Sequence, residues 1–187
     1  MASELRFHPE QHRGAPTGQA LALIRLFDRA YETEVRDLFV RCLREIAPSS
    51  VQAQLEAYIA RALDGDYRDI AQHYRPGRGR GFWLALSRDG DLMGTFALQP
   101  SREDVVELRR MYVGAEFRRC GVARTMLARA EALCAGWGFR RLCLTTSTLN
   151  RAAIELYCSA GYHQSDYVAE SSQGEPLPLG LRVFTFE

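Results

Sequence analysis

The sequence predicts a mixed α/β fold, and three observations carry that prediction. Apolar runs at strand spacing and at helix spacing follow one another in the order β-α-α-β-β-β-α-β-α-β-β. Arg-Asp-Gly at 88–90 is a strong hairpin signal between two apolar runs. The run at 105–113 passes through an Arg/Gly turn directly into an amphipathic helix.

Size and composition favour one domain. The 187 residues are 47% hydrophobic, which is enough for a substantial core. Residues 1–19 are polar and interrupted by proline and glycine, so they are predicted to be a loosely ordered leader. Residues 20–187 are predicted to form the single domain.

The domain is predicted to begin with a strand and two helices. Residues 20–27 form an apolar run typical of a strand. Apolar side chains recur at helical spacing over 33–46. A second helix is predicted over roughly 51–63, where Ser49 or Ser50 is placed to cap it.

Residues 64–81 admit two interpretations. They form a solvated connection that ends in a basic, glycine-rich turn, or they contribute to function. In the functional interpretation the acids and tyrosines line an acceptor pocket, and the arginines meet an anionic group. The residues concerned are Asp64, Asp66, Tyr67, Asp69, Tyr74, Arg75, Arg78 and Arg80.

The rest of the chain is predicted to alternate between strands and helices. A loop rich in Ser, Gly and Pro at 171–180 separates the last two strands. The predicted strands are 82–87, 91–98, 105–113, 141–146, 162–168 and 181–186, and the predicted helices are 121–135 and 151–160.

The turn at 118–123 has the form R-x-x-G-x-A. Gly121 and Ala123 are small, so the backbone there can come close to a bulky anion. The helix that follows presents unpaired N–H groups and the positive end of its dipole, which suits a diphosphate. The alternative is a junction that only makes a tight turn. The turn is neither a P-loop nor a dinucleotide fingerprint.

A second motif, N-x-x-A-x-x-L-Y-x-x-x-G-Y, occupies 150–162. Asn150 is a good N-cap and Gly161 a good helix stop. Tyr157 lies two turns after Asn150 on the same helical face. The alternative is a short capped helix on a sheet, with Tyr157 half-buried in the core.

Together, in this order, the two motifs resemble the GNAT family of N-acetyltransferases. The resemblance is firm over 91–168 and looser over 21–90. It implies a mixed, mostly antiparallel central sheet flanked by helices. It also implies transfer of an acetyl group from acetyl-CoA, as co-substrate, to a primary amine of a small or amino-acid-like acceptor. The amine attacks directly in a ternary complex.

The resemblance also implies which residues hold acetyl-CoA. The strand segment that pairs with the pantetheine arm corresponds to Met111, Tyr112 and Val113, and Asn150 corresponds to a cofactor-contacting asparagine. Backbone amides of the turn bind the diphosphate, and two arginines add charge. The turn residues are Arg118, Arg119, Cys120, Gly121, Val122, Ala123 and Arg124.

Two residues are implied in proton transfer. Tyr157 corresponds to the family's proton donor, and its pKa near 10 lies above that of a thiol near 8.5. Glu107 corresponds to a glutamate that acts as a base through a water in some members. Its alternative is an exposed strand carboxylate paired with Arg109 or Arg110. An acyl-cysteine route through Cys158 is rejected, because Cys158 has no placed His or Asp partner.

Composition bounds the partners and the location. With 24 basic and 23 acidic side chains, the chain has no charge signature for nucleic acid or membrane. Its five cysteines form no CxxC and no metal site is predicted, while Cys134 and Cys143 are predicted to be buried thiols. No apolar signal core is visible, so a cytoplasmic protein is expected. By analogy with the family, 162–186 is the segment expected to form any homodimer.

Two other functions stay open from the sequence. One is acetylation of a protein lysine or N-terminal amine, which the acids at 64, 66 and 69 would also fit. The other is a non-catalytic acyl-CoA-binding regulatory module. Retention of both Tyr157 and Glu107 disfavours the module.

Overall fold

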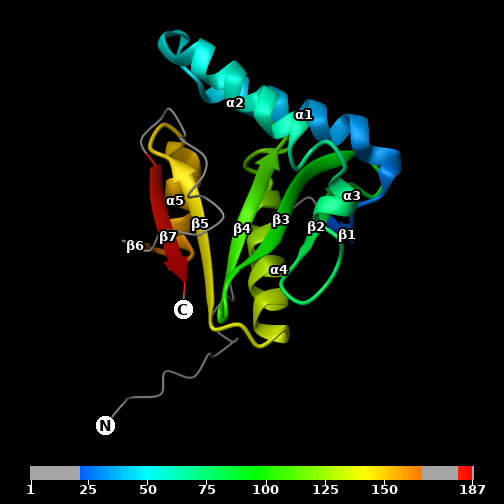
Figure 1. Ribbon diagram of the computed structural model, residues 1–187, viewed down its shortest axis with the longest axis vertical. Helices are drawn as coiled ribbons and strands as arrows, with labels where there is room; N and C mark the ends of the chain where they lie inside the picture. The colour runs from blue at the N-terminus through cyan, green and yellow to red at the C-terminus, as the bar shows by residue number, and fades with distance from the viewer. Residues whose placement is uncertain (1–21, 166–180, 187) are drawn as a thin grey trace.

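A computed structural model describes residues 22–165 and 181–186, which build a seven-stranded mixed sheet with helices on both faces (Figure 1). The strand order is β1-β2-β3-β4-β5-β7-β6, and only the β4–β5 pair is parallel. This confirms the predicted mixed, mostly antiparallel sheet. The strands are β1 (Leu23–Leu26), β2 (Gly81–Leu86), β3 (Leu92–Arg102), β4 (Val105–Val113), β5 (Arg141–Ser147), β6 (His163–Ser165) and β7 (Leu181–Phe186).

The predicted long helices are all present, with ends shifted by no more than one residue. The predicted leader at 1–19 and the predicted loop at 171–180 lie outside the described residues. The helices are α1 (Glu32–Ile46), α2 (Gln52–Asp64), α3 (Ile70–His73), α4 (Val122–Gly136) and α5 (Arg151–Ser159).

Two predictions for the N-terminal half are wrong. Neither Ser49 nor Ser50 caps α2, because Ser49–Val51 forms a 3-10 turn and the N-cap position falls on Val51. The solvated connection at 64–81 contains the short helix α3, and Tyr67 and Tyr74 in it are fully buried. Their rings pack under α1 and on β2, so this segment is part of the core.

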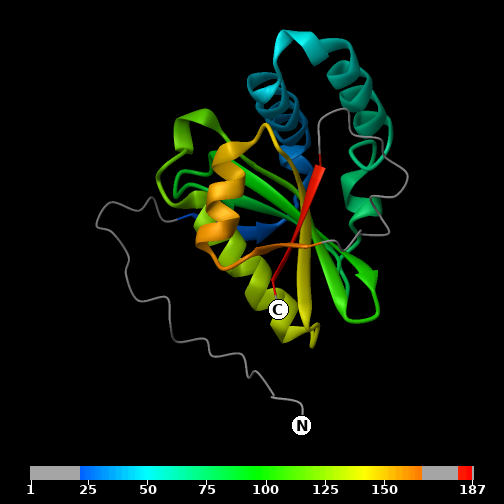
Figure 2. The same ribbon diagram turned by 90° about the vertical axis from the view of Figure 1, so that its left-hand side faces the viewer.

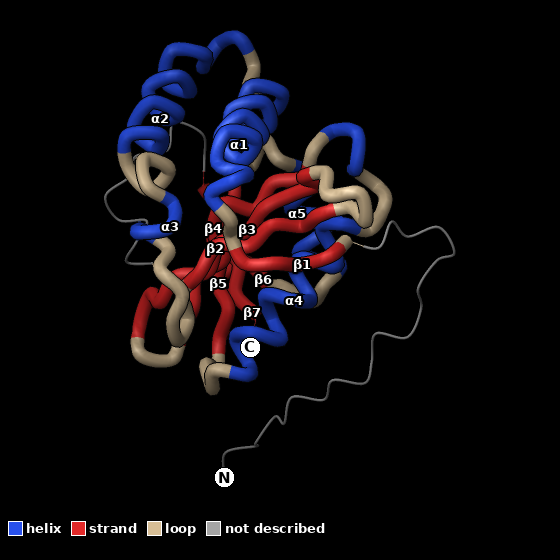
Figure 3. Tube along the Cα trace, turned by 90° about the vertical axis from the view of Figure 1, so that its right-hand side faces the viewer, coloured by secondary structure: helices blue, strands red, loops and turns tan. Residues whose placement is uncertain are grey.

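The helices cover the two faces of the sheet unequally. Helices α4 and α5 lie on one face, where Met126 and Tyr157 pack with Phe96 (Figure 2). Helices α1, α2 and α3 lie on the other face, where Phe39 and Tyr58 join a second apolar core (Figure 3). We call these the α4/α5 face and the α1/α2 face.

Strand β4 is paired on both sides at its start and with β3 alone, among the described strands, further along. It pairs with β5 only from Val105 to Leu108, and Figure 1 shows the two strands diverging beyond that point. On its other side the β3 register shifts, so that Arg110 and Met111 lie opposite the single residue Phe96. This is a β-bulge, and it places Arg110 at a φ of 51°.

The backbone of β3 at Gly94 is tightly packed against β4 and α4. A Cβ atom there would lie 2.6 Å from the Tyr112 carbonyl oxygen and 3.1 Å from the Met126 sulfur. Because the first contact is backbone, Gly94→Ala is expected to lower the free energy of unfolding by about 2 kcal/mol, measured by urea denaturation. Gly136→Ala in α4 is the control. A Cβ there meets nothing within 4 Å, so that variant should be as stable as wild type or slightly more so. Equal losses from both substitutions would contradict the argument.

Candidate active site

The divergence of β4 from β5 opens a cavity of about 140 Å³. Its walls come from both diverging strands, from α1 and α2, and from the start and middle of α5. It is lined by four predicted site residues, which are Met111 and Tyr112 on β4 and Asn150 and Tyr157 of the second motif. The lining residues are Leu43, Ile46, Leu55, Tyr58, Leu108, Arg109, Arg110, Met111, Tyr112, Thr145, Thr146, Ser147, Asn150 and Tyr157.

The bulge that opens β4 is anchored by a buried ion pair. Arg110 Nε and Nη2 donate to the two carboxylate oxygens of Asp66, each at 2.7 Å, and both side chains are at most 6% exposed. Arg110 Nη1 donates to the Tyr58 hydroxyl at 2.7 Å, and the Tyr74 hydroxyl donates to Asp66 at 2.5 Å. Thr95 donates its hydroxyl to the Arg110 carbonyl at 3.0 Å. These bonds hold a non-glycine residue in a left-handed conformation that costs about 1–2 kcal/mol.

The partners of Asp66 keep its carboxyl group ionised. Burial by itself would raise the pKa of the carboxyl group, but the Arg110 guanidinium and the Tyr74 hydroxyl outweigh it and hold that pKa below its ordinary value. The guanidinium also lies over the rings of Tyr67 and Phe39, at 5.2 and 5.5 Å. The α2–α3 segment is thereby tied to the cavity edge of β4.

The segment Met111–Val113 lies along the open side of β4. The β5 ladder has ended at Leu108, and no other described strand pairs with this side of the segment, which suits an extended ligand. Met111 and Tyr112 line the cavity. The Val113 carbonyl is already engaged, because Arg118 Nε donates to it at 3.2 Å and the Cys42 thiol at 3.5 Å.

The Arg/Gly turn has a backbone suited to an anion. Arg119 and Gly121 both have positive φ, at 60° and 82°, and such alternations turn successive N–H groups inward. Thr125 donates the first intrahelical N–H of α4 to the Gly121 carbonyl, at 3.0 Å. The N–H groups of residues 122–124 precede that bond, so the fold leaves them for a ligand. The turn therefore fits the diphosphate predicted for it.

The side chains of the turn differ in what they offer. Arg118 forms an ion pair with Glu45 of α1, and its guanidinium also contacts Cys42, so it joins the turn to α1. Arg119 and Arg124 are exposed. The Cys120 thiol donates to the Arg118 carbonyl at 3.4 Å, while Val122 is buried and Ala123 half-buried. The Cys120 side chain thus makes a hydrogen bond within the turn.

Asn150 and Tyr157 occupy the predicted positions on α5. The Asn150 carboxamide caps the helix by accepting the Ala153 N–H at 3.2 Å. The Tyr157 hydroxyl donates to the Met111 sulfur at 3.7 Å, which brings it to the open side of β4. Burial raises the pKa of Tyr157 above its ordinary value, so the phenol is protonated throughout the physiological range.

Glu107 is buried, so the exposed-carboxylate alternative is wrong, and Arg110 pairs with Asp66 instead. In the sheet, Glu107 lies opposite Gln99 of β3 and opposite Cys143 of β5, one residue before the β4–β5 ladder ends. It shares a face of β4 with Arg109, two residues on, which lines the cavity.

The acids at 64–69 do not line the cavity, contrary to the functional interpretation. Asp66 is held by Arg110 beneath the cavity edge. Asp64 is exposed beside Arg68, and Asp69 caps α3 and pairs with Arg29.

The arginines of the following turn are also absent from the cavity lining. Arg78 donates instead to the Trp137 carbonyl at 3.0 Å.

The cysteines follow the prediction. Burial raises the pKa of Cys134 to about 11 and that of Cys143 to about 12, so both thiols stay protonated. Cys158 is exposed and is absent from the cavity lining, which agrees with the rejection of an acyl-cysteine route.

Several cavity residues were not predicted from the sequence. The polar ones are Arg109 and Arg110 on β4, Tyr58 on α2, and the hydroxyl residues at 145–147, and the apolar ones are Leu43, Ile46, Leu55 and Leu108. The adjacent arginines at 109 and 110 are the one local signal, because two neighbouring charges interrupt the alternation of an apolar strand and indicate a bulge.

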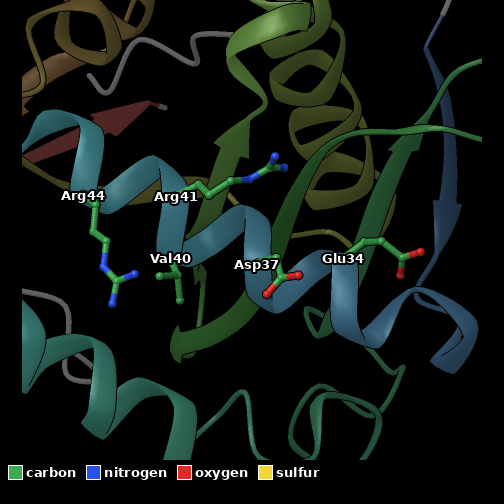
Figure 4. Close-up of a pocket in the computed structure, with 5 residues that line it drawn as sticks. All are labelled: Glu34, Asp37, Val40, Arg41 and Arg44. Carbon is green, nitrogen blue, oxygen red and sulfur yellow. The ribbon is translucent and has the colours of Figure 1, made fainter.

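A larger hollow of about 410 Å³ lies along α1 and is lined by that helix alone (Figure 4). It is lined by Glu34, Asp37, Val40, Arg41 and Arg44. Figure 4 shows the Arg41 and Arg44 side chains pointing apart, and Arg44 pairs with Glu56 of α2. The hollow contains none of the predicted site residues.

Within residues 22–165 and 181–186, no helix is both long and apolar enough to span a bilayer. The same part of the chain contains no cluster of three or more His, Cys, Asp or Glu side chains suited to a metal ion.

Comparisons with known proteins agree with this geometry. The model of the Acetyltransferase (GNAT) family matches residues 32–162. N-acetylaspartate synthetase of Homo sapiens is 34% identical over 134 residues, which cover 70% of this chain and 43% of that protein. The chain spans about half the length of the curated relatives it matches.

Two solved structures share the fold. An acetyltransferase of the GNAT family from Staphylococcus aureus Mu50 has a TM-score of 0.70 at 19% identity, covering 88% of this chain and 98% of that one. The PaiA N-acetyltransferase from Thermoplasma acidophilum, solved in complex with coenzyme A, has a TM-score of 0.69 at 16% identity, covering 89% and 99%.

Removing one partner of the buried pair should be costly. Asp66→Asn leaves the Arg110 charge buried and uncompensated, so the free energy of unfolding at pH 7 is expected to fall by about 3–5 kcal/mol in urea denaturation. The double variant Asp66→Asn/Arg110→Met should lose less than Asp66→Asn alone, because the charge is gone. A larger loss in the double variant would contradict the argument.

The pair also predicts a pH dependence. The pKa of Asp66 is lowered in the folded state, so its contribution is full above the unfolded pKa of about 4 and is lost as pH falls below that value. Between pH 6 and pH 3, wild type should therefore lose more stability than Asp66→Asn. Parallel stability curves would show that the pair does not set this dependence.

Proposed function

Since the chain belongs to the acetyltransferase (GNAT) family, we propose that it transfers the acetyl group of acetyl-CoA to a primary amine of a small, amino-acid-like acceptor. The observation that carries this proposal is the cavity between β4 and β5. It is lined by Tyr157 and Asn150 from α5 and by the open side of β4, which leads on to the Arg/Gly turn. The amine attacks the acetyl group directly in a ternary complex.

The binding of acetyl-CoA is supported by two neighbouring features. The inward N–H groups of the turn suit the diphosphate, and the unpaired side of Met111–Val113 suits an extended pantetheine arm. The Thermoplasma acidophilum neighbour was solved with coenzyme A, and its fold is shared here. When bound, acetyl-CoA supplies the activated acyl group, a thioester.

In the proposed mechanism the chain orients the reactants and moves protons. A main-chain N–H of the Met111–Val113 segment is proposed to donate to the acetyl oxygen and so stabilise the negative charge that develops there. The C–N bond forms as the C–S bond breaks, and Tyr157 gives its proton to the departing sulfur. Burial keeps that phenol protonated, so its hydrogen is available to the sulfur as negative charge develops there while the C–S bond breaks.

Glu107 is proposed to accept the proton that the attacking amine loses. It lies one residue before the end of the β4–β5 ladder and on the same face as the cavity residue Arg109. It is absent from the cavity lining, so it would act through an intervening water.

The acceptor class is supported by size and by relatives. A cavity of about 140 Å³ suits a small molecule better than a peptide segment. The human relative is named N-acetylaspartate synthetase, so the product named for that protein is an N-acetylated amino acid. Acetylation of a protein lysine or N-terminal amine is the alternative, and a panel of peptides and small amines separates the two.

Gly121→Glu is expected to abolish acetyl-CoA binding in calorimetric titration. The substitution puts a carboxylate and a Cβ where φ is 82°, within the Arg/Gly turn that is proposed to bind the diphosphate and that we call the cradle. Gly138→Glu is the matched control, because φ there is 76° and a Cβ meets nothing within 4 Å. Normal binding by Gly121→Glu, or equal loss in both variants, would count against the cradle.

Tyr157→Phe is expected to lower kcat about 100-fold while KM for acetyl-CoA stays near wild type, measured by thiol release. The control is Tyr67→Phe, which removes another buried hydroxyl, one with no hydrogen-bond partner in the described part of the chain. That variant should keep wild-type rates. A wild-type kcat in Tyr157→Phe would remove the phenol from the mechanism.

A further inference from the structure

We propose that the Thr145 hydroxyl binds the amine of the acceptor and orients its lone pair toward the acetyl group. This role rests on the proposed function and adds a residue to the same site. It makes Thr145 a determinant of the reaction rate, and of the preference for a primary amine over its N-methyl counterpart.

The Thr145 hydroxyl is a buried polar group that the fold leaves unbonded. Its oxygen atom finds no hydrogen-bond partner within the described residues, although the residue lines the cavity. Buried hydroxyl groups in folded proteins usually have a partner, because burial removes their hydrogen bonds to water. Thr95 shows the usual case in this sheet, since its buried hydroxyl donates to the Arg110 carbonyl at 3.0 Å. The partner of the Thr145 hydroxyl is therefore sought in the cavity.

The backbone around Thr145 is held on one side only. Thr145 lies one residue beyond Leu144, where the pairing of β5 with β4 ends, and its main chain pairs with Val183 of β7. Threonine is branched at Cβ, so few χ1 rotamers are open to it on a strand. The hydroxyl is thus presented at the cavity wall from a fixed backbone and a stiff side chain.

The cavity reaches both faces of the sheet. Leu108 and Tyr157 belong to the apolar core on the α4/α5 face, and Leu55 and Tyr58 belong to the core on the α1/α2 face. All four line the cavity. The gap between the diverging strands therefore connects the two faces.

Thr145 lies on the α1/α2 side of this gap. Side chains alternate along β5, and Leu144 belongs to the core on the α4/α5 face, so Thr145 points to the opposite face. Tyr157, the proposed proton donor to the sulfur, reaches the gap from the α4/α5 side. The departing sulfur and the attacking amine are thus assigned to opposite sides of the gap, and Thr145 lies on the side of the amine.

The chemistry of a neutral primary amine fits a hydroxyl oxygen as acceptor. One N–H donates to the Thr145 oxygen, which directs the lone pair to the carbonyl carbon. As the C–N bond forms and the C–S bond breaks, the second N–H gives its proton to the proposed base, and the first stays in the amide product. Positive charge develops on the nitrogen during attack, so the hydrogen bond to Thr145 strengthens. The hydroxyl therefore contributes more to kcat than to substrate binding.

The same contact distinguishes primary from secondary amines. An N-methyl amine has a single N–H, whose proton must leave during the reaction. Its methyl group would then lie against the Thr145 hydroxyl, which would stay buried without a partner. A site built around a hydrogen bond disfavours an analogue that cannot make it.

The first test measures the rate of thiol release from acetyl-CoA with leucine, phenylalanine, aspartate and phenethylamine. Thr145→Val keeps the shape of the side chain and removes the hydroxyl. It is expected to lower kcat about 10- to 100-fold for the amine used best, while KM for acetyl-CoA stays near wild type. Thr145→Ser keeps the hydroxyl and should stay within about threefold of wild type. The control is Thr33→Val, on the exposed side of α1 and absent from the cavity lining, which should keep the wild-type rate.

Stability separates this role from a structural one. Because the Thr145 hydroxyl has no partner in the described part of the fold, Thr145→Val should be as stable as wild type, or more stable, in urea denaturation. Thr95→Val removes a hydroxyl that is bonded and should be less stable than wild type. A loss of stability in Thr145→Val as large as that in Thr95→Val would contradict the proposal.

The second test compares each amine with its N-methyl counterpart. For wild type, kcat/KM is expected to be at least about 100-fold higher for the primary amine. Thr145→Ala removes the hydroxyl and leaves room for the methyl group, so it should reduce this preference to less than about tenfold. A structural defect would lower both rates alike and leave their ratio unchanged.

The outcomes separate this role from the proposed function. Thiol release with none of the primary amines, although acetyl-CoA binds, would overturn the proposed function itself. A wild-type kcat in Thr145→Val would overturn the role of Thr145 and leave the acetyltransferase intact, the hydroxyl then being bonded only to a water. An unchanged preference in Thr145→Ala would also overturn it. If Thr145→Val does not fold, Thr145→Ser against Thr145→Ala decides the question.

Discussion

The buried pair between Arg110 and Asp66 is the interaction on which the cavity depends. Strand β4 must pair with β5 at its start and leave it four residues later, and the bulge at Arg110 is where its geometry changes. A non-glycine residue holds that conformation because its side chain is bonded to Asp66 and Tyr58 on two other elements. The helices over the α1/α2 face therefore do more than cover apolar surface. They fix the strand edge along which the ligand is proposed to lie.

Main-chain groups carry much of the proposed recognition, and the side chains of the Arg/Gly turn mainly stabilise its shape. The cradle is made by the positive φ angles of Arg119 and Gly121 and by the N–H groups at the start of α4. Cys120 contributes a bond inside the turn, and Arg118 secures the turn to β4 and α1. Side chains there shape the loop, while the peptide groups are proposed to face the diphosphate.

The sequence was sufficient for the fold, the family and the positions of Asn150 and Tyr157, because these depend on local periodicity, caps and motif spacing. It was insufficient where partners are distant along the chain. The segment at 64–74 looked solvated because its acids and tyrosines are polar one by one, and only packing against Arg110 and Phe39 makes it core. The place where β4 leaves β5 has no local signature beyond the adjacent arginines at 109 and 110. Arg109 and Thr145 were missed for the same reason, since only the course of the two strands brings both residues to the cavity wall.

The end of β5, which forms one wall of the cavity, depends on β7 for its pairing. Beyond Leu144, β5 is no longer paired with β4, and among the described strands Thr145, Thr146 and Ser147 are paired with β7. Their partners, Val183, Arg182 and Leu181, lie further along the chain than α4, so they are synthesised after it. A nascent polypeptide can thus complete the turn and α4 long before this wall is secured. The order of synthesis therefore allows the turn that is proposed to bind the diphosphate to form before the wall of the proposed acceptor cavity is complete.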